Sequence, residues 1–328
     1  MGKAGSRTTR SRLLAGLLLL ATLLAGCGPT YQPPFTVGTN PWIGYEPLYL
    51  ARALGHYDDV PLRLVELGSN TQAMDALRAG RLDAAGLTLD EALTLADEQV
   101  PIRIVWVLDV SAGADALVAK PDIPTLAALR GRRIGVEQTA VGAYLLDAAL
   151  RRAGLSAADV TLVPLPVDAH VSAFESGAID AVVTFDPARQ ALLNAGGQVL
   201  FDSRMLPGEV VDVLVVRRDA LDCCTQAIAS LIAGQQRALD HLARRREDAL
   251  ARMAPRLGLS PADVARSLEG LVLPDAAYNR SLLDGPTPDL AETARHQARL
   301  MRQRGLLSTD IDTRGLIDGQ FLQPESRR

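Results

Sequence analysis

The sequence is poor in aromatic residues, in cysteine and in any excess of basic charge. Aromatic residues make up 4% of its 328 residues, there are three cysteines, and 34 lysines and arginines stand against 38 aspartates and glutamates. Because binding to nucleic-acid phosphates needs a basic surface, this balance argues against a nucleic-acid partner. The hydrophobic share of 48% and the charged share of 22% are typical of a folded chain about two domains long, which excludes intrinsic disorder.

Motifs of the common catalytic and metal sites are also missing from the sequence. It contains no Gly-x-Ser-x-Gly, no phosphate-binding Gly-Lys-Ser/Thr loop, no His-Glu-x-x-His and no Gly-x-Gly-x-x-Gly. The four histidines lie far apart and do not pair at metal-ligand spacing. The run from Asp310 to Phe321 fails as a calcium loop, because Arg314 and Phe321 stand where oxygen ligands are needed. We therefore expect a protein that is not an enzyme and holds no cofactor or metal.

One strongly apolar run stands near the N-terminus, from Leu13 to Ala25. Its 13 residues are too few to cross a bilayer as a helix, and a basic segment precedes it, which is typical of a signal peptide. The following Leu24-Ala25-Gly26-Cys27 resembles a bacterial lipobox. This resemblance implies a lipoprotein signal peptide over 1–26, an acylated Cys27 that anchors the mature chain in a lipid bilayer, and a location in the cell envelope facing the periplasm or the outside.

Removal of the leader changes the charge of the protein. Residues 1–26 contain four basic and no acidic residues, so the mature chain has a formal net charge of −8. Residues 27–34 then form a short tether that ends in Pro33 and Pro34. Cys223 and Cys224 are adjacent, and we expect them to be either two thiols or a strained pair without catalytic function.

From Phe35 onward, short β-branched runs alternate with amphipathic helical stretches, which is the pattern of an α/β fold. A helix, a glycine, an aliphatic residue and Asp-Ala occur in this order twice, at Gly80 and again at Gly177, and this predicts two similar lobes. We assign 35–119 and 211–328 to lobe 1 and 120–210 to lobe 2, with a helical C-terminal segment after Asp219. The similar strands Asp115–Lys120 and Asp212–Arg217 are the predicted crossings of a hinge, unless both are hairpins of one continuous sheet.

Four segments together resemble a known family, and they are spread over most of the mature chain: Trp42-Ile-Gly-Tyr-Glu-Pro-Leu-Tyr-Leu-Ala, the repeated Gly-x-aliphatic-Asp-Ala, Leu129-Arg-Gly-Arg-Arg-Ile-Gly-Val and Val183-Thr-Phe-Asp-Pro. They are similar to the nitrate/sulfonate/taurine class of ABC-transporter solute-binding proteins, and also to the thiamine-pyrimidine-binding proteins. The resemblance implies a two-lobed, periplasmic-binding-protein-like (type II) fold of doubly wound sheets joined by a two-strand hinge. It further implies capture of a small solute in an interlobe cleft and its delivery to an ABC permease with ATPase subunits.

Ligands of doubly wound sheets bind beyond the carboxyl ends of the strands, so the residues at those junctions are the predicted ligand contacts. Trp42 is the first candidate, since six of the 13 aromatic residues fall between Tyr31 and Tyr57 and Gly44 keeps its loop open. We expect Tyr45 and Tyr49 to pack inside the protein instead. The full predicted set is Trp42, Ser69, Asn70, Thr88, Asp109, Ser111, Glu137, Thr139, Asp168, Phe185, Asp186 and Asp212; several of its hydroxyl and amide groups could equally be helix caps.

Acidic side chains outnumber basic ones at these junctions, where Arg189 is the one nearby base. This balance favours a cation, an amine or a neutral ligand rich in hydrogen-bond donors, because buried carboxylates need partners. Two other functions remain open: a sensory solute-binding lipoprotein without a permease, and a biosynthetic enzyme on the same fold. The lipobox argues against the enzyme, because such biosynthetic steps take place in the cytoplasm.

Overall fold

The computed structural model describes residues 33–137, 140–286 and 288–322. The predicted signal peptide, Cys27 and most of the tether lie outside the described residues. Within the described ranges, no helix has both the length and the apolar character that crossing a bilayer requires.

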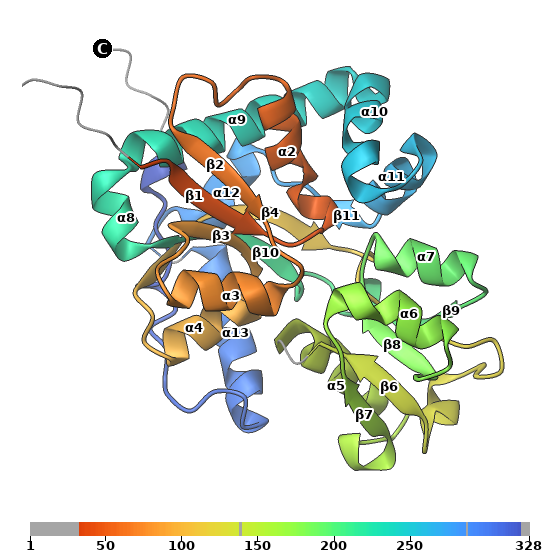
Figure 1. Cartoon of the computed structure of the whole chain (residues 1–328). Helices are drawn as coiled ribbons and strands as arrows, with labels where there is room; N and C mark the ends of the chain where they lie inside the picture. The colour runs from red at the N-terminus through yellow and green to blue at the C-terminus, as the bar shows by residue number, and fades with distance from the viewer. Residues whose placement is uncertain (1–32, 138–139, 287, 323–328) are drawn as a thin grey trace, which may run out of the picture. The chain divides into compact units, whose positions relative to one another are not determined.

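The first of two sheets has six strands in the order β11-β4-β10-β3-β1-β2 (Figure 1). β1 runs parallel to β2 and to β3, whereas β10 lies antiparallel between β3 and β4. The strands are β1 (Phe35–Thr39), β2 (Leu62–Glu66), β3 (Ala84–Thr88), β4 (Ile102–Ser111), β10 (Val211–Arg217) and β11 (Leu271–Val272).

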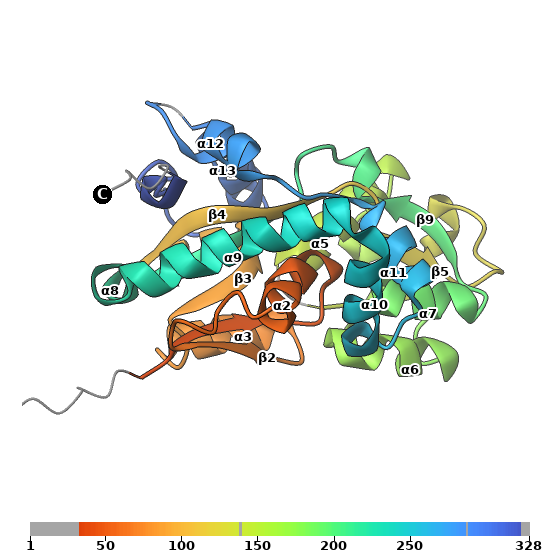
Figure 2. The ribbon, with the colours of Figure 1, turned by 90° about the horizontal axis from the view of Figure 1, so that it is seen from above.

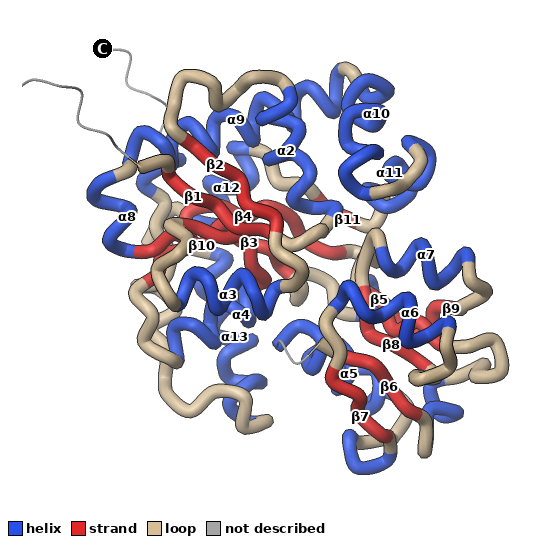
Figure 3. Tube along the Cα trace, in the orientation of Figure 1, coloured by secondary structure: helices blue, strands red, loops and turns tan. Residues whose placement is uncertain are grey.

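The second sheet repeats this plan with five strands in the order β7-β6-β8-β5-β9 (Figure 3). β6 is parallel to β7 and β8, and β5 lies antiparallel between β8 and β9. The strands are β5 (Ala116–Ala119), β6 (Arg133–Val136), β7 (Thr161–Pro164), β8 (Ala181–Thr184) and β9 (Gln198–Asp202). Two sheets with the same mixed pairing confirm the predicted α/β architecture.

Helices follow most strands and cover the sheets. They are α2 (Glu46–Ala53), α3 (Asn70–Arg78), α4 (Leu89–Asp97), α5 (Ala140–Arg152), α6 (His170–Glu175) and α7 (Ala188–Asn194), with the short 3-10 helices η1 (Ile43–Tyr45) and η4 (Val167–Ala169). The predicted helical C-terminal segment is confirmed: α8 (Arg218–Cys223), α9 (Thr225–Arg244), α10 (Arg246–Leu257), α11 (Pro261–Leu268), α12 (Ala276–Leu283) and α13 (Asp289–Gln303).

The C-terminal helices share one apolar core with the first sheet, and α9 runs beside α2 (Figure 2). The sequence predicts one helix over 222–252, but the structure divides it into three. Arg245 adopts φ −133° and ψ 52°, which is not helical and separates α9 from α10. Cys223 and Cys224, at the end of α8, form a disulfide with each other.

The repeated motif performs the same task in both sheets. Gly80 and Gly177 have φ of 67° and 77°, so each ends its helix in the left-handed region that glycine accepts. Three residues later, the Asp83 carboxylate accepts the Thr36 amide at the start of β1 at 2.7 Å. The Asp180 carboxylate likewise accepts the Arg133 amide at the start of β6 at 2.9 Å. Each aspartate thus fixes the beginning of a central strand.

The chain passes between the sheets twice, through 112–115 and through 203–210. The two passages are hydrogen-bonded to each other: the Ser203 hydroxyl lies 2.7 Å from the Ser111 hydroxyl and accepts the Gly113 amide at 2.7 Å. β5, which the predicted boundary at residue 119 assigns to lobe 1, pairs within the second sheet, because both its neighbours, β8 and β9, belong there. The precise limits of the lobes stay a prediction.

Candidate ligand-binding site

A small cavity of about 10 Å³, which has room for about one water molecule, is lined by residues from both sheets. The first sheet and its connections contribute Asn40, Trp42, Tyr45, Asn70, Thr88 and Asp212, and the second contributes Asp115, Val141 and Phe185. Asn40 and Phe185 directly follow β1 and β8, and Thr88 ends β3. The site therefore lies at the carboxyl ends of parallel strands, as expected for this kind of sheet.

Two aspartates reach the same edges from antiparallel strands. Asp212 is paired with Thr88, so the start of β10 meets the end of β3. Asp115 immediately precedes Ala116, which is paired with Thr184 at the end of β8. The two sheets thus place one aspartate each, at equivalent positions, against the shared cavity.

The position of Trp42 is fixed by two contacts. Its indole N–H donates to Asp109 Oδ2 at 3.0 Å, and its ring meets the Phe185 ring edge-on, with centroids 5.3 Å apart. A Cβ on Gly44 would overlap the Asp109 carboxylate and approach Trp42 Nε1. Glycine at position 44 is therefore needed for this arrangement, while the ring contact joins elements of the two sheets.

Tyr45 lines the cavity, contrary to the prediction that it only packs inside the protein. Its hydroxyl donates to Asp212 Oδ1, and burial raises the pKa of this phenol well above its usual value. Tyr49 does pack as predicted: it is buried, and its hydroxyl lies 2.5 Å from that of Thr39.

A second cavity, also of about 10 Å³, adjoins the first and shares Asp115, Val141 and Phe185 with it. Its other lining residues are Glu137, Gly142, Leu145, His170 and Val183. Burial lowers the pKa of His170 to about 4, so the ring is neutral at pH 7. Because His170 Nε2 lies 3.2 Å from the Leu165 carbonyl oxygen, this nitrogen carries the proton and Nδ1 accepts from the Thr184 hydroxyl at 3.1 Å.

Glu137 connects the second sheet to the start of α3. Its carboxylate accepts the Thr71 hydroxyl at 2.8 Å and the Thr71 amide at 3.3 Å. An acid at a helix N-terminus is favourable, since the unpaired amides there carry partial positive charge. Both Thr71 donors in the first turn of α3 are therefore already bound to a carboxylate of the protein itself.

Buried carboxyl groups surround the first cavity. Burial raises the pKa of Asp115 to about 7 and, together with neighbouring carboxylates, that of Glu91 to about 8. Burial raises the pKa of Asp109 to about 8 as well, and the pKa of Asp212 is also raised, by burial and by the charge of Asp109. No lysine or arginine is found among the described residues that line either cavity.

The structure brings together half of the predicted contacts. Trp42, Asn70, Thr88, Glu137, Phe185 and Asp212 line the two cavities. Four more are placed behind the lining or away from it: Asp109 holds Trp42, Ser69 accepts the Gln72 amide as the cap of α3, Ser111 lies at the passage between the sheets, and Asp186 is buried beside Arg189. Asp168 is exposed in η4, and Thr139 lies outside the described residues.

Eight lining residues were not among the predicted contacts: Asn40, Tyr45, Asp115, Val141, Gly142, Leu145, His170 and Val183. Asn40 carries a usable signal, because it directly follows β1. Asp115 stands directly before a strand and not after one. The expectation that ligands bind beyond the carboxyl ends of strands therefore does not select it. Val141 and His170 have no chemical signal in the sequence that separates them from core residues.

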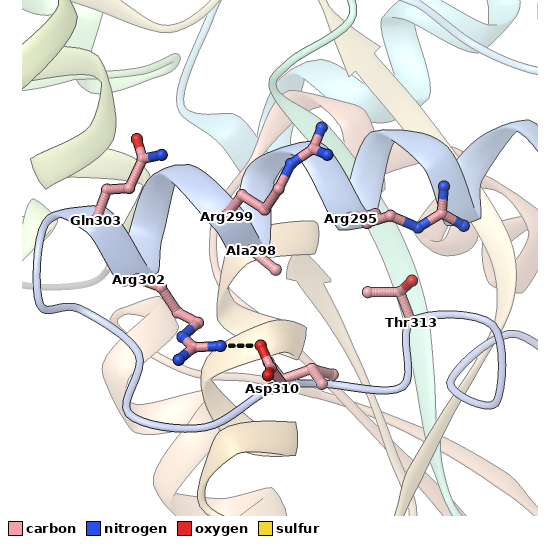
Figure 4. A pocket seen from close by; sticks show the side chains of 8 residues that line it. Arg295, Ala298, Arg299, Arg302, Gln303, Asp310 and Thr313 are labelled. Carbon is pink, nitrogen blue, oxygen red and sulfur yellow. Dashed lines mark ion pairs between the residues drawn. The ribbon is translucent and has the colours of Figure 1, made fainter.

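A larger groove, of about 410 Å³, runs along α13 and is lined by Arg295, Arg299 and Arg302 (Figure 4). These arginines are exposed, and Arg302 pairs with Asp310. None of the polar side-chain atoms that line this groove is buried without a partner. Because an exposed charged face needs no ligand, we place the site in the cavities between the sheets.

Comparison with known proteins agrees with this architecture. The model of the NMT1-like family matches residues 28–257. The taurine-binding periplasmic protein of Escherichia coli is 32% identical over 154 residues, which are 46% of this chain and 48% of that protein. The putative aliphatic sulfonates-binding protein of Escherichia coli is 30% identical over 217 residues, 64% of this chain and 66% of that protein. The chain thus spans less than two thirds of either relative.

The solved alkanesulfonate-binding protein SsuA from Xanthomonas axonopodis pv. citri, bound to MOPS, has a similar fold. Its TM-score is 0.74 with 21% identity, and the match covers 88% of this chain and all of that one. The likeness confirms the predicted two-sheet, periplasmic-binding-protein-like fold. At this identity it shows the fold alone.

Proposed function

The chain belongs to the NMT1-like family, and from that premise we propose that it is an extracytoplasmic solute-binding lipoprotein serving an ABC importer. One observation supports this function most: a single buried polar cavity whose walls come from both sheets. A solute held there contacts both halves at once. The names of the matched relatives support the same class of function.

Capture takes place by hinge closure in this proposal. The passages 112–115 and 203–210 are the hinge, and the contacts Trp42–Phe185 and Thr71–Glu137 form when the halves meet. Because the solute touches both halves, it binds the closed form more tightly and shifts the population toward it. The closed protein then delivers the solute to the permease and ATPase subunits.

Acylated Cys27 is the membrane anchor in this proposal, with the mature chain facing away from the cytoplasm. The thiol is the acylated atom, so Cys27→Ser should move the protein from the membrane fraction to the soluble fraction. Retention of the variant in the membrane would contradict a lipid anchor at this residue.

Solute capture is tested by incubating residues 28–328 with a small-molecule extract, washing, denaturing the protein and identifying what is released by mass spectrometry. We expect one solute, recovered unchanged at about one molecule per chain. Trp42→Ala should abolish recovery, whereas Tyr278→Ala, which removes an exposed aromatic ring on α12, should leave it unaffected. Chemical conversion of the solute during incubation would contradict a binding protein and favour an enzyme.

A further inference from the structure

We propose that the solute is a small organic cation with N–H groups, an ammonium or a guanidinium, whose charged head binds at Asp115. This inference rests on the proposed function of the same cavity and specifies its ligand class. Three properties of the lining carry it: four of its donors are bound to carboxylates of the protein, several buried oxygens are unpartnered, and positive charge is lacking.

Four hydrogen-bond donors around the cavity are already bound to carboxylates. Trp42 Nε1–H donates to Asp109, and the Tyr45 hydroxyl donates to Asp212. The Asn70 amide nitrogen donates to both oxygens of Glu91 at 2.9 Å. The Thr88 amide, at the start of α4, also donates to Glu91, at 3.0 Å. A sulfonate or nitrate entering the cavity would have to displace these internal acceptors.

The acceptors that remain have no partner among the described residues. They are Asn40 Oδ1, Asn70 Oδ1, Thr88 Oγ1 and Asp115 Oδ2, and these residues are only 1%, 4%, 4% and 6% exposed. All four residues line the same cavity, and the Thr88 hydroxyl can also donate. Leaving a buried acceptor unpaired costs free energy, which a ligand that donates to these oxygens recovers.

The charge of the residues that line the cavity also favours a cationic ligand. Asp115 and Asp212 face the cavity from opposite sheets, and no lysine or arginine among the described lining residues balances them. The nearby base Arg189 lies beside Asp186, with Nη1 3.6 Å from the carboxylate, and does not line the cavity. A bound cation favours the ionised form of Asp115, and the cavity is also lined by the rings of Trp42, Tyr45 and Phe185, a residue type that attracts cations.

The second cavity indicates which chemical group can be attached to the charged head of the ligand. It opens from Asp115 and is walled by Val141, Leu145, Val183 and Phe185, with neutral His170 at its side. An apolar group a few carbons long attached to the charged head fits this chemistry. The ligand class is therefore a short alkyl or aryl ammonium, or the corresponding guanidinium.

Calorimetric titration with probes that share one tail tests the ligand class. The probes are n-butylammonium, n-butylguanidinium and 1-butanesulfonate, together with tetramethylammonium, which is a cation without N–H groups. We expect at least one of the two N–H cations to bind tenfold or more tightly than either of the other probes. Tighter binding of butanesulfonate, tighter binding of tetramethylammonium, or no binding of both N–H cations would overturn the assignment.

Two variants locate the charged head. Asp115→Asn keeps the shape and removes the charge, so it should weaken binding of the N–H cation by about 30-fold or more. Glu46→Gln is the matched control, because Glu46 is 1% exposed but pairs with Arg256 at 2.6 Å and does not line either cavity. Its affinity should stay within about threefold of the wild type. Equal affinities in the wild type and Asp115→Asn would contradict the site.

A milder variant covers the case in which Asp115→Asn does not fold. Asn40→Ala removes one acceptor and should weaken binding about fivefold.

Failure of the ligand class is distinguishable from failure of the proposed function. A protein that binds butanesulfonate and recovers an unchanged anionic solute still captures solutes, whereas one that converts its solute does not belong to this class of function.

Discussion

At the scale of single residues, Gly44 determines where the main aromatic contact lies. The absence of a Cβ allows the Asp109 carboxylate to approach the backbone at position 44 and receive the Trp42 indole N–H. Trp42 is then held against Phe185, on the other side of the cavity. A glycine outside any turn thus has a role in recognition.

Gly44→Ala should therefore weaken both folding and binding. The added methyl group overlaps Asp109, and relief of such overpacking typically costs about 1–3 kcal/mol. We expect a lower midpoint in urea denaturation and an affinity reduced about tenfold. Gly196→Ala is a control for substitution of a glycine, since nothing lies within 4 Å of its Cβ, although its φ of 87° adds some strain. Wild-type affinity in Gly44→Ala would contradict the role assigned to this position.

The buried carboxyl groups predict how stability depends on pH. The raised pKa values of Asp115, near 7, and of Glu91 and Asp109, near 8, mean that the folded protein holds more protons than the unfolded chain. The stability that these bound protons contribute is fully present below about pH 4 and is lost as the pH rises through 7 to 8. His170 changes the stability in the opposite direction. Because its pKa is lowered to about 4 in the folded protein, it makes the protein more stable as the pH rises, but only up to about pH 6.5.

Between pH 6.5 and 8.5, the ligand-free protein should therefore become less stable as the pH rises. Each carboxyl group lowers the free energy of unfolding by at most about 1.4 kcal/mol per pH unit. Urea denaturation at three values in this range measures the slope, and Asp115→Asn should make it shallower. A slope of zero, or one of opposite sign, would show that these carboxyl groups ionise in the folded protein at ordinary pH.

Residue-level prediction succeeded for several residues that follow strands, but it missed Asn40, directly after β1, and Asp115, directly before β5. Trp42, Thr88 and Phe185 stand after or at the ends of strands and do line the cavity. Asp115 was missed because β5 is antiparallel to β8, which brings the beginning of β5 to the edge where β8 ends. Strand direction is a property of the whole sheet and cannot be read from a four-residue strand.

At the scale of elements, the alternation of short β-branched runs with amphipathic stretches correctly predicted the α/β architecture. It was less successful after β10, where 222–252 was expected to be one helix. The breaks at Cys224 and Arg245 occur at residues without any helix-breaking signal, since neither is glycine or proline. Local helix propensity therefore does not set these boundaries.

The N-terminus of α3 provides a test at this scale. Thr71 does not line either cavity, but its hydroxyl and amide bind Glu137 from the second sheet. Thr71→Val removes the hydroxyl bond and should weaken solute affinity about fivefold, because closure loses about 1 kcal/mol. Thr71→Ser keeps the hydroxyl and should retain the affinity. If Thr71→Val binds as tightly as the wild type, this contact does not contribute to closure.

At the scale of the whole molecule, the two sheets are variations of one plan. Each has three parallel strands followed by an antiparallel strand that arrives from the other part of the chain, and each has a glycine and an aspartate that fix its central strand. The repeat at Gly80 and Gly177 made this symmetry predictable. The depth of the cavity was not predictable, because it depends on how closely side chains such as Trp42 and Phe185 meet across it.

The central claim is that a solute closes the two sheets around one cavity. Small-angle X-ray scattering of residues 28–328, with and without the solute recovered from the extract, measures closure directly. We expect the radius of gyration to decrease on saturation in the wild type and to stay constant in Asp115→Asn at the same solute concentration. An unchanged radius of gyration in a wild-type sample that calorimetry shows to be saturated would contradict capture by closure.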